Sequence, residues 1–260
     1  MIDTDTLDLR RRWLWIAGLL LCTPAAFAAD YDAQLHWYRK AALGTPVSGV
    51  VEKVHVQAGD RVREGQPLVE LDRRVPEADV QALKAELLQA ENDLAEAGRE
   101  LGRTQELYDR TLLADRDLQL AIIARDAAAA RLSRVRASLV QAEWLLSHST
   151  IRAPYDGVVV KLAASVGQTV VSQLQSTPLL EVAGQARMLA RARVRGGELD
   201  ALHRGAAAEV EVAGRRYRGD IVRIALEPFA DDPGRYAVDV LFETDGAGLR
   251  VGQAAKVSFR

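Results

Sequence analysis

Histidine and cysteine side chains, the usual carriers of catalysis and metal binding, are few and widely separated in this sequence. The four histidines, His36, His55, His148 and His203, have no partner at the spacing of a metal site or a catalytic triad. No glycine-rich phosphate-binding loop follows a predicted strand. We therefore expect no catalytic residue, no metal ligand and no cofactor, and we expect a protein that is not an enzyme.

Soft metals such as copper require thiolate, thioether or imidazole ligands. Beyond residue 28 the chain has no cysteine, and Met188 is its only methionine. A role in handling metal ions is therefore unsupported. The near-neutral net charge of -2 likewise gives no reason to expect a nucleic-acid partner.

A short β motif occurs twice, at residues 44–72 and 149–183. The two copies flank the segment between them and are expected to position it. Each copy has a proline, then a glycine before two valines, then a second glycine ten residues later: Pro46, Gly49 and Gly59 in the first, and Pro154, Gly157 and Gly167 in the second. Each copy reads as three strands joined by glycine turns. The second copy has about three extra residues near Gln173 to Gln175, which predict a longer loop.

The two copies are expected to pack face to face as a small sandwich, because a short sheet with one apolar face is not stable alone. Alternation of side chains along the strands predicts which residues face inward. The expected apolar faces are Val50, Val54 and Val56 in the first copy and Val158, Val160 and Leu162 in the second.

A helical segment with a coiled-coil pattern separates the two copies. Apolar and small residues recur at alternating spacings of three and four from Val80 to Thr111, and again from Leu118 to Leu146 with Arg125 as the one misfit. Pro76 suits the first helical turn, and Asp115 is expected to cap the second helix. The pattern predicts an antiparallel hairpin whose arms reach about 50 Å. Its many alanines bury little surface, so we expect its flanks to meet other copies or a partner.

After Gly184 the alternation of apolar and polar residues returns in about five segments separated by turns. A short helix is expected from Glu198 to Leu202. These features predict a small antiparallel barrel.

The N-terminus has the pattern of a secretory signal peptide. Three arginines, Arg10 to Arg12, precede a short apolar run that ends near Cys22, and a small-residue cleavage site follows at residues 26–28. Cleavage is expected after Ala28, because the apolar run is shorter than the roughly 20 residues that span a bilayer. A retained anchor or a lipid on Cys22 remain alternatives. An exported chain without disulfides fits a bacterial periplasm.

The predicted fold class is therefore mixed α and β, elongated and multidomain. A split lipoyl-like β-sandwich contains an inserted antiparallel α-helical hairpin and precedes a small antiparallel β-barrel. The expected parts are the signal peptide 1–28, an initial strand 29–43 that could join the barrel, the lipoyl-like halves 44–75 and 149–183, the hairpin 76–148 and the barrel 184–260.

This arrangement resembles the periplasmic adaptor family, also called membrane fusion proteins or HlyD-like proteins. The resemblance covers nearly all of the chain after residue 28. It is carried by residues 49–72, by residues 151–159 with the sequence IRAPYDGVV, and by the glycine-centred segments 217–222 and 249–253 in the barrel.

The family pattern at the hairpin tip has Arg, Leu and Ser at offsets zero, four and eleven. Arg103 and Leu107 match, whereas Ala114 stands where serine is expected. The resemblance therefore implies docking on an outer-membrane channel through the following tip residues: Arg103, Leu107, Leu112, Leu113, Ala114 and Asp115.

The resemblance also implies partners and a location. It implies an inner-membrane transporter, with the RND type slightly favoured over the ABC type, a TolC-like outer-membrane channel, and self-association into a ring, expected to be a hexamer. The protein would lie in the periplasm, associated with the inner membrane, as a subunit that links the two partners and seals an export conduit.

The alternative function is a lipoyl- or biotinyl-type carrier module, which uses the same sheet motif. A carrier holds its cofactor on a lysine at the turn between the two halves. Here that turn is residues 71–74, Leu-Asp-Arg-Arg, and it contains no lysine. The carrier function is therefore disfavoured.

Overall fold

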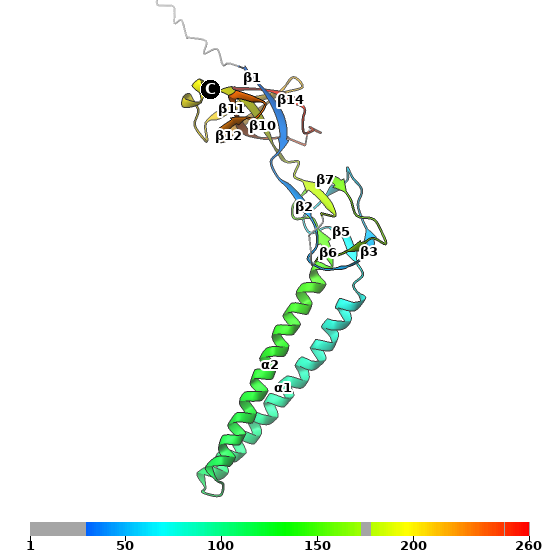
Figure 1. Ribbon diagram of the computed structural model, residues 1–260, viewed down its shortest axis with the longest axis vertical. Coiled ribbons are helices and arrows are strands. Elements are labelled where there is room, and N and C mark those ends of the chain that lie inside the picture. Colours follow the sequence, from blue (N-terminus) through cyan, green and yellow to red (C-terminus); the bar gives the residue numbers. More distant parts are fainter. Residues whose placement is uncertain (1–29, 173–177, 247, 260) are drawn as a thin grey trace, which may run out of the picture.

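The computed structural model describes residues 30–172, 178–246 and 248–259. It has three parts in a row: a β-barrel, a β-sandwich and a long helical hairpin that projects away from both (Figure 1). The predicted fold class is confirmed. The expected signal peptide, its cleavage site after Ala28 and the longer loop at residues 173–175 lie outside the described residues.

The sandwich is formed by two four-stranded sheets that exchange strands between the sequence repeats. One sheet has the order β2-β9-β7-β4 and the other has the order β6-β5-β3-β8. The strands are β2 (Lys40–Leu43), β3 (Gly49–Val54), β4 (Arg61–Val62), β5 (Pro67–Leu71), β6 (Thr150–Arg152), β7 (Gly157–Leu162), β8 (Thr169–Val170) and β9 (Leu180–Ala183).

Matching hydrogen bonds join the two repeats. The Gly59 amide donates to the Val159 carbonyl at 2.8 Å, and the Gly167 amide donates to the Val51 carbonyl at 2.9 Å. Gly59 and Gly167 have φ of 99° and 85°, so these turns need the left-handed backbone that glycine adopts freely. Each repeat therefore supplies a turn that closes the other repeat's first strand.

The predicted inward faces of the sandwich strands were wrong at one position in each copy. Val51 and Val159 are buried in the core, whereas Val50 and Val160 are 44% and 37% exposed. The register shifts between Val51 and Lys53 in β3 and at the equivalent place in β7. A bulge adds one residue to the strand and reverses the alternation of its side chains, so a strict period of two fails there.

The hairpin consists of α1 (Arg74–Asp109) and α2 (Asp115–His148). The buried residues of both helices all lie on the predicted seam: Val80, Ala90 and Thr104 in α1, and Leu118, Leu132, Val135 and Ala142 in α2. Arg125, the predicted misfit, is exposed. The heptad pattern thus located the contact between the helices.

Both arms of the hairpin start from neighbouring, paired strands. Strand β5 leads into α1, α2 leads into β6, and Glu70 is paired with Thr150 in the antiparallel ladder. The Leu71 amide donates to the Ser149 carbonyl at 2.8 Å across the two junctions. Asp72 accepts hydrogen bonds from the Arg74 side chain and amide, which lower the pKa of its carboxyl to about 2.

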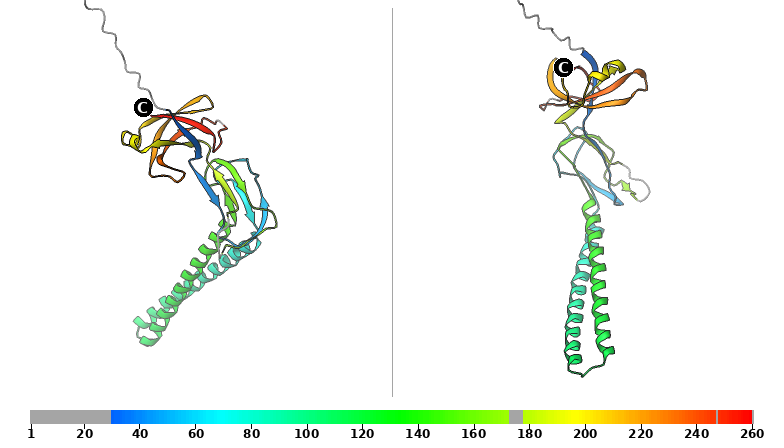
Figure 2. Two further views of the ribbon diagram at one scale, coloured as in Figure 1. Left: turned by 45° about the horizontal axis from the view of Figure 1, so that its top comes forward. Right: turned by 90° about the vertical axis from the view of Figure 1, so that its left-hand side faces the viewer.

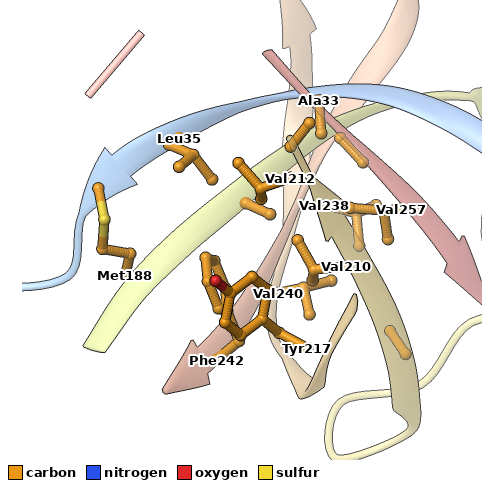
Figure 3. Close-up of a cluster of buried hydrophobic side chains, with 14 of the residues drawn as sticks. Ala33, Leu35, Met188, Val210, Val212, Tyr217, Val238, Val240, Phe242 and Val257 are labelled. Carbon is orange, nitrogen blue, oxygen red and sulfur yellow. The ribbon is translucent and has the colours of Figure 1, made fainter. Parts of the chain in front are cut away.

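The barrel is closed, with the strand order β1-β10-β13-β12-β11-β14. Its elements are β1 (Asp30–Trp37), β10 (Arg187–Arg195), the 3-10 helix η1 (Gly196–Ala201), β11 (Ala207–Val212), β12 (Arg215–Phe229), β13 (Asp232–Glu243) and β14 (Ala254–Phe259). The core contains mainly small aliphatic residues, with Tyr217 and Phe242 packed at 5.3 Å between ring centroids (Figure 3).

The segment expected as one initial strand is divided between two parts of the molecule. Strand β1 belongs to the barrel, whereas β2 pairs with β9 in the sandwich. The chain therefore passes between barrel and sandwich twice, at residues 38–39 and again at residues 184–186. In the views of Figure 2 the barrel and the hairpin lie at opposite ends of the sandwich.

Gly157 and Gly49 occupy equivalent positions in the two repeats but have different surroundings. A Cβ on Gly157 would lie 2.2 Å from the Ala183 carbonyl oxygen, whereas one on Gly49 would meet Leu71 at an ordinary 3.5 Å. We expect Gly157→Ala to lower the free energy of unfolding of the sandwich by about 2–4 kcal/mol, because backbone must move. Gly49→Ala, the control, should change it by less than about 1 kcal/mol. Equal effects in chemical denaturation would contradict this account of the close approach between β7 and β9.

Candidate docking site at the hairpin tip

The end of α1 is closed by a Schellman motif. The Leu112 amide donates to the Leu107 carbonyl at 3.0 Å, and the Thr111 amide donates to the Tyr108 carbonyl at 2.8 Å. These are the two hydrogen bonds of that motif, which satisfies carbonyls left open at a helix C-terminus. An apolar contact between the first and last residues of the motif usually accompanies it, and here both of those residues are leucines.

Thr111 is the strained residue of this turn. Its φ is 59°, in the left-handed region that a β-branched residue rarely adopts. Its hydroxyl donates to the Arg110 carbonyl at 2.7 Å. The prediction that Thr111 continues the helical seam was therefore wrong, because α1 has already ended at Asp109.

The start of α2 also differs from the prediction. Ala114 is the N-cap residue, with φ -78° and ψ 152°, and Asp115 is the first helical residue rather than the cap. Within the described residues no side chain caps this helix end. Asp115 and Asp117 lie in the first turn, where their charges complement the helix dipole.

Because Ala114 is the N-cap residue of α2, a serine at this position would cap the helix. A serine hydroxyl at an N-cap accepts a hydrogen bond from a helix amide, worth about 1 kcal/mol relative to alanine. The serine of the family pattern would therefore act first on the helix end itself. Its replacement by Ala114 changes the stability of the tip as well as its contacts.

The remaining predicted residues present a mixed apolar and cationic surface. Leu112 is 66% exposed in the loop, Leu107 is 40% exposed, and Leu113 is half-buried. Arg103 lies one helical turn from Leu107 and forms a surface ion pair with Glu100, at 3.1 Å between Nη1 and Oε2. Exposed leucines beside an arginine suit contact with another protein.

One apolar residue of this region was missed by the sequence reasoning. Leu120 lies in the second turn of α2 and is 53% exposed. Its signal was available, because it lies two residues after the seam position Leu118 and so off the seam. An apolar residue off a heptad seam must find another contact or face water.

The structure also bears on the carrier alternative. Strand β5 ends at Leu71 and α1 begins at Arg74, so the place of a carrier's modified turn is a helix start. No lysine is available there, and the Asp72 side chain is hydrogen-bonded to Arg74.

None of the helices in the described ranges has the length and apolar character needed to cross a membrane.

Thr111→Gly should stabilise the hairpin by about 1 kcal/mol, because glycine adopts the left-handed backbone without strain. The matched control is Ala114→Gly at the other end of the same loop, where φ is already negative and no strain is relieved. The rate of hydrogen exchange at the tip amides measures the stability of the hairpin tip in both variants. Faster exchange in Thr111→Gly than in the unsubstituted chain would contradict the assignment of strain.

Comparison with known proteins identifies the family. Residues 39–182 match the family model described as RND MFP, barrel-sandwich hybrid domain. The macrolide export protein MacA of Yersinia pestis is 32% identical over 207 residues, covering 73% of this chain and 56% of that protein. The pyoverdine export membrane fusion protein PvdR of Pseudomonas aeruginosa is 31% identical over 207 residues, covering 73% and 53%. The chain thus spans about half the length of these curated relatives.

Solved structures share the fold. A MacA-MexA chimeric protein that contains the Pseudomonas aeruginosa MexA α-hairpin has a TM-score of 0.66 at 22% identity, covering 89% of this chain and 78% of that one. ZneB of Cupriavidus metallidurans has a TM-score of 0.51 at 23% identity, covering 89% and 97%. The split sandwich, the inserted hairpin and these matches together establish that the chain belongs to the membrane fusion protein family of periplasmic adaptors.

Proposed function

We propose that this protein is a non-catalytic adaptor subunit of a tripartite export system. It links an inner-membrane transporter to an outer-membrane channel, and several copies in a ring, six by our expectation, seal a conduit between them. The relatives are named for macrolide export and pyoverdine export, which supports a role in export. Either an RND-type or an ABC-type transporter is compatible, with the RND type slightly favoured.

One observation carries the proposal: the barrel and the hairpin tip lie at opposite ends of the molecule (Figure 1). The arms contain 36 and 34 residues, which corresponds to a reach of about 50 Å. Both arms are fixed on paired strands, so a force on the tip is transmitted to the sandwich. A rigid projection of this length suits a bridge between two partners better than it suits a binding pocket.

The tip is the end we assign to the outer-membrane channel. Leu107, Leu112 and Leu113 would supply apolar contacts, and Arg103 would supply a charge. Ala114 and Asp115 would shape the start of α2 rather than form the main contact. The barrel, at the far end, would face the transporter.

The location follows from the same proposal. The N-terminal pattern supports export to the periplasm with cleavage after Ala28, and association with the inner membrane would come through the transporter. The role requires no cofactor, metal or nucleic acid.

The docking role of the tip can be tested with a photo-crosslinking amino acid in place of Leu112, in cells that express the full chain. We expect a covalent product with an outer-membrane channel protein, identified by mass spectrometry. Arg103→Glu should reduce that product about tenfold, as expected for loss of one well-placed charged contact.

The control is Lys84→Glu, which reverses a charge near the base of α1 in a similar surface ion pair with Glu143. It should leave the product unchanged. If Arg103→Glu and Lys84→Glu give equal yields while the hairpin stays folded, Arg103 has no docking role. Crosslinks to no outer-membrane protein, in cells whose export is intact, would exclude the tip.

A further inference from the structure

The outer face of the barrel contains a carboxylate that is almost completely covered. Asp239 of β13 lies between Val238 and Val240, which point into the barrel core, so its own side chain points outward. That side chain is nevertheless only 3% exposed. Arg191 of β10 and Arg223 of β12 lie opposite it in the two neighbouring ladders and cover it from both sides. The three residues form one charged row across three adjacent strands.

This row has unused hydrogen-bond donors. Arg191 donates to both carboxylate oxygens of Asp239, through Nε at 2.7 Å and Nη2 at 3.1 Å, and Arg223 donates through Nε at 2.8 Å. Nη1 of Arg191 and both terminal nitrogens of Arg223 make none of these bonds. A planar guanidinium group can bind a second oxyanion through such a free edge.

The row also carries an excess of positive charge. Burial alone would raise the pKa of the Asp239 carboxyl, but hydrogen bonds from both arginines hold that pKa below its ordinary value. The carboxylate is therefore ionised at neutral pH. Among the described residues, Asp239 is the acidic partner recorded for each arginine, so one carboxylate balances two guanidinium groups. The row can accept one further negative charge.

Both arginines line a groove of about 600 Å³ on the barrel surface. Its other walls are mainly apolar, and they include Ile224, Leu226, Pro228, Phe229 and Ala237. A second hollow of about 230 Å³ is lined by Arg191 and Phe229 as well, so the two spaces adjoin. Spaces of this size are typical of sites for small organic molecules.

A bulge in β12 forms one edge of the groove. Ile224 pairs with Val238, but the next paired residues are Pro228 and Tyr236, so residues 225–227 are left out of the ladder. Leu226 lies in this bulge and is 96% exposed. It therefore adds almost nothing to the barrel core. Bulges often direct a side chain toward a functional site, and here the exposed leucine lies beside the arginines.

We propose that this groove binds a small, soluble, amphipathic organic anion. A carboxylate or phosphate group of the ligand binds the free edges of Arg191 and Arg223, and its apolar part lies against Leu226 and Phe229. The nearly buried Asp239 holds the two guanidinium groups in place before the ligand arrives, which lowers the entropic cost of binding. The site lies on the barrel and depends on neither the hairpin tip nor a ring of copies.

The charges around the groove favour a single dissolved molecule over a membrane surface. Glu227 lines the groove, Asp32 lines the adjoining hollow, and Asp231 lies nearby in an ion pair with Arg193; all three carboxylates are on exposed residues. An anionic bilayer would bring many headgroups against these carboxylates and would be repelled. One small anion can contact the arginines alone.

Three probes separate the two parts of the proposed ligand in nuclear magnetic resonance titrations of the purified full chain. Octanoate has both an anionic group and an apolar chain, butanoate has a shorter chain, and octyl glucoside has the same chain without the charge. Octanoate should bind about tenfold more tightly than butanoate, because each buried methylene group adds about threefold to fourfold in affinity. Octyl glucoside should bind at least about tenfold more weakly than octanoate. Equal binding of octanoate and octyl glucoside would overturn the proposal.

Two substitutions test the two halves of the site separately. Arg223→Gln should weaken octanoate and butanoate binding by the same factor, about tenfold, because it removes the charge but not the apolar wall. Leu226→Ser should leave butanoate binding unchanged and reduce the preference for octanoate about threefold to tenfold. Because Leu226 is 96% exposed, its replacement leaves the fold intact. An unchanged preference in Leu226→Ser would contradict the apolar half of the site.

Arg216→Gln is the matched control for the charged half. Arg216 lies on the same strand and forms surface ion pairs with Glu209 and Glu211, at 3.4 Å and 3.5 Å, away from the groove. Its replacement should leave the binding of all three probes unchanged. If Arg216→Gln and Arg223→Gln weaken octanoate binding equally, the effect is one of general charge and the proposal fails.

Sedimentation of the same proteins tests other occupants of the groove. Binding to phosphatidylglycerol vesicles that is lost in Arg223→Gln would assign the groove to a membrane surface and overturn the proposal. A change in the association state in Leu226→Ser would show that a second copy covers the groove, with the same consequence. Failure of octanoate to bind would leave the adaptor role standing, because the titrations measure neither docking nor export.

Discussion

Antiparallel pairing of β5 with β6 is the constraint on which the rest of the molecule depends. The hairpin leaves the sandwich after Leu71 and returns at Thr150, and these residues lie at the paired ends of adjacent strands. The two antiparallel helices therefore have their bases side by side and project from the same edge of the sandwich, so they can meet along a seam from base to tip. The same pairing fixes the level of every residue of α1 against α2.

The sandwich secures that pairing by exchanging strands between the two repeats. Each four-stranded sheet contains strands of both repeats, because β4 pairs with β7 and β8 pairs with β3. The helical insertion therefore interrupts the sequence of the sandwich without dividing its fold. The two arms are therefore anchored in a single folded unit to which both repeats contribute strands.

Local periodicity predicted more of this structure than any single residue did. The seam from Val80 to Tyr108 and from Leu118 to Leu146 followed from spacing alone, since a heptad contact depends only on positions along each helix. The inward faces at Val50 and Val160 were wrong because each strand contains a bulge, which has no residue-type signature here. Thr111 and Asp115 were misplaced because the cap geometry, and not side-chain preference, decided where the helices end.

The tip could be located from the break in the heptads, but its chemistry could be only partly predicted. Arg103 and Leu107 stood out through a resemblance, whereas Leu120 was overlooked although its place off the heptad seam could have indicated it. Which surfaces touch another protein depends on partners that one chain does not encode.

The central claim is that the hairpin acts as a strut of fixed length between two partners. The most direct test removes one heptad from each arm at the same level, residues 91–97 and 128–134, which keeps the seam aligned and shortens the reach by about 10 Å. Export would be measured for a compound whose tolerance is lost when the gene is deleted. The account predicts a folded hairpin that no longer supports export, and full export by the shortened protein would contradict it.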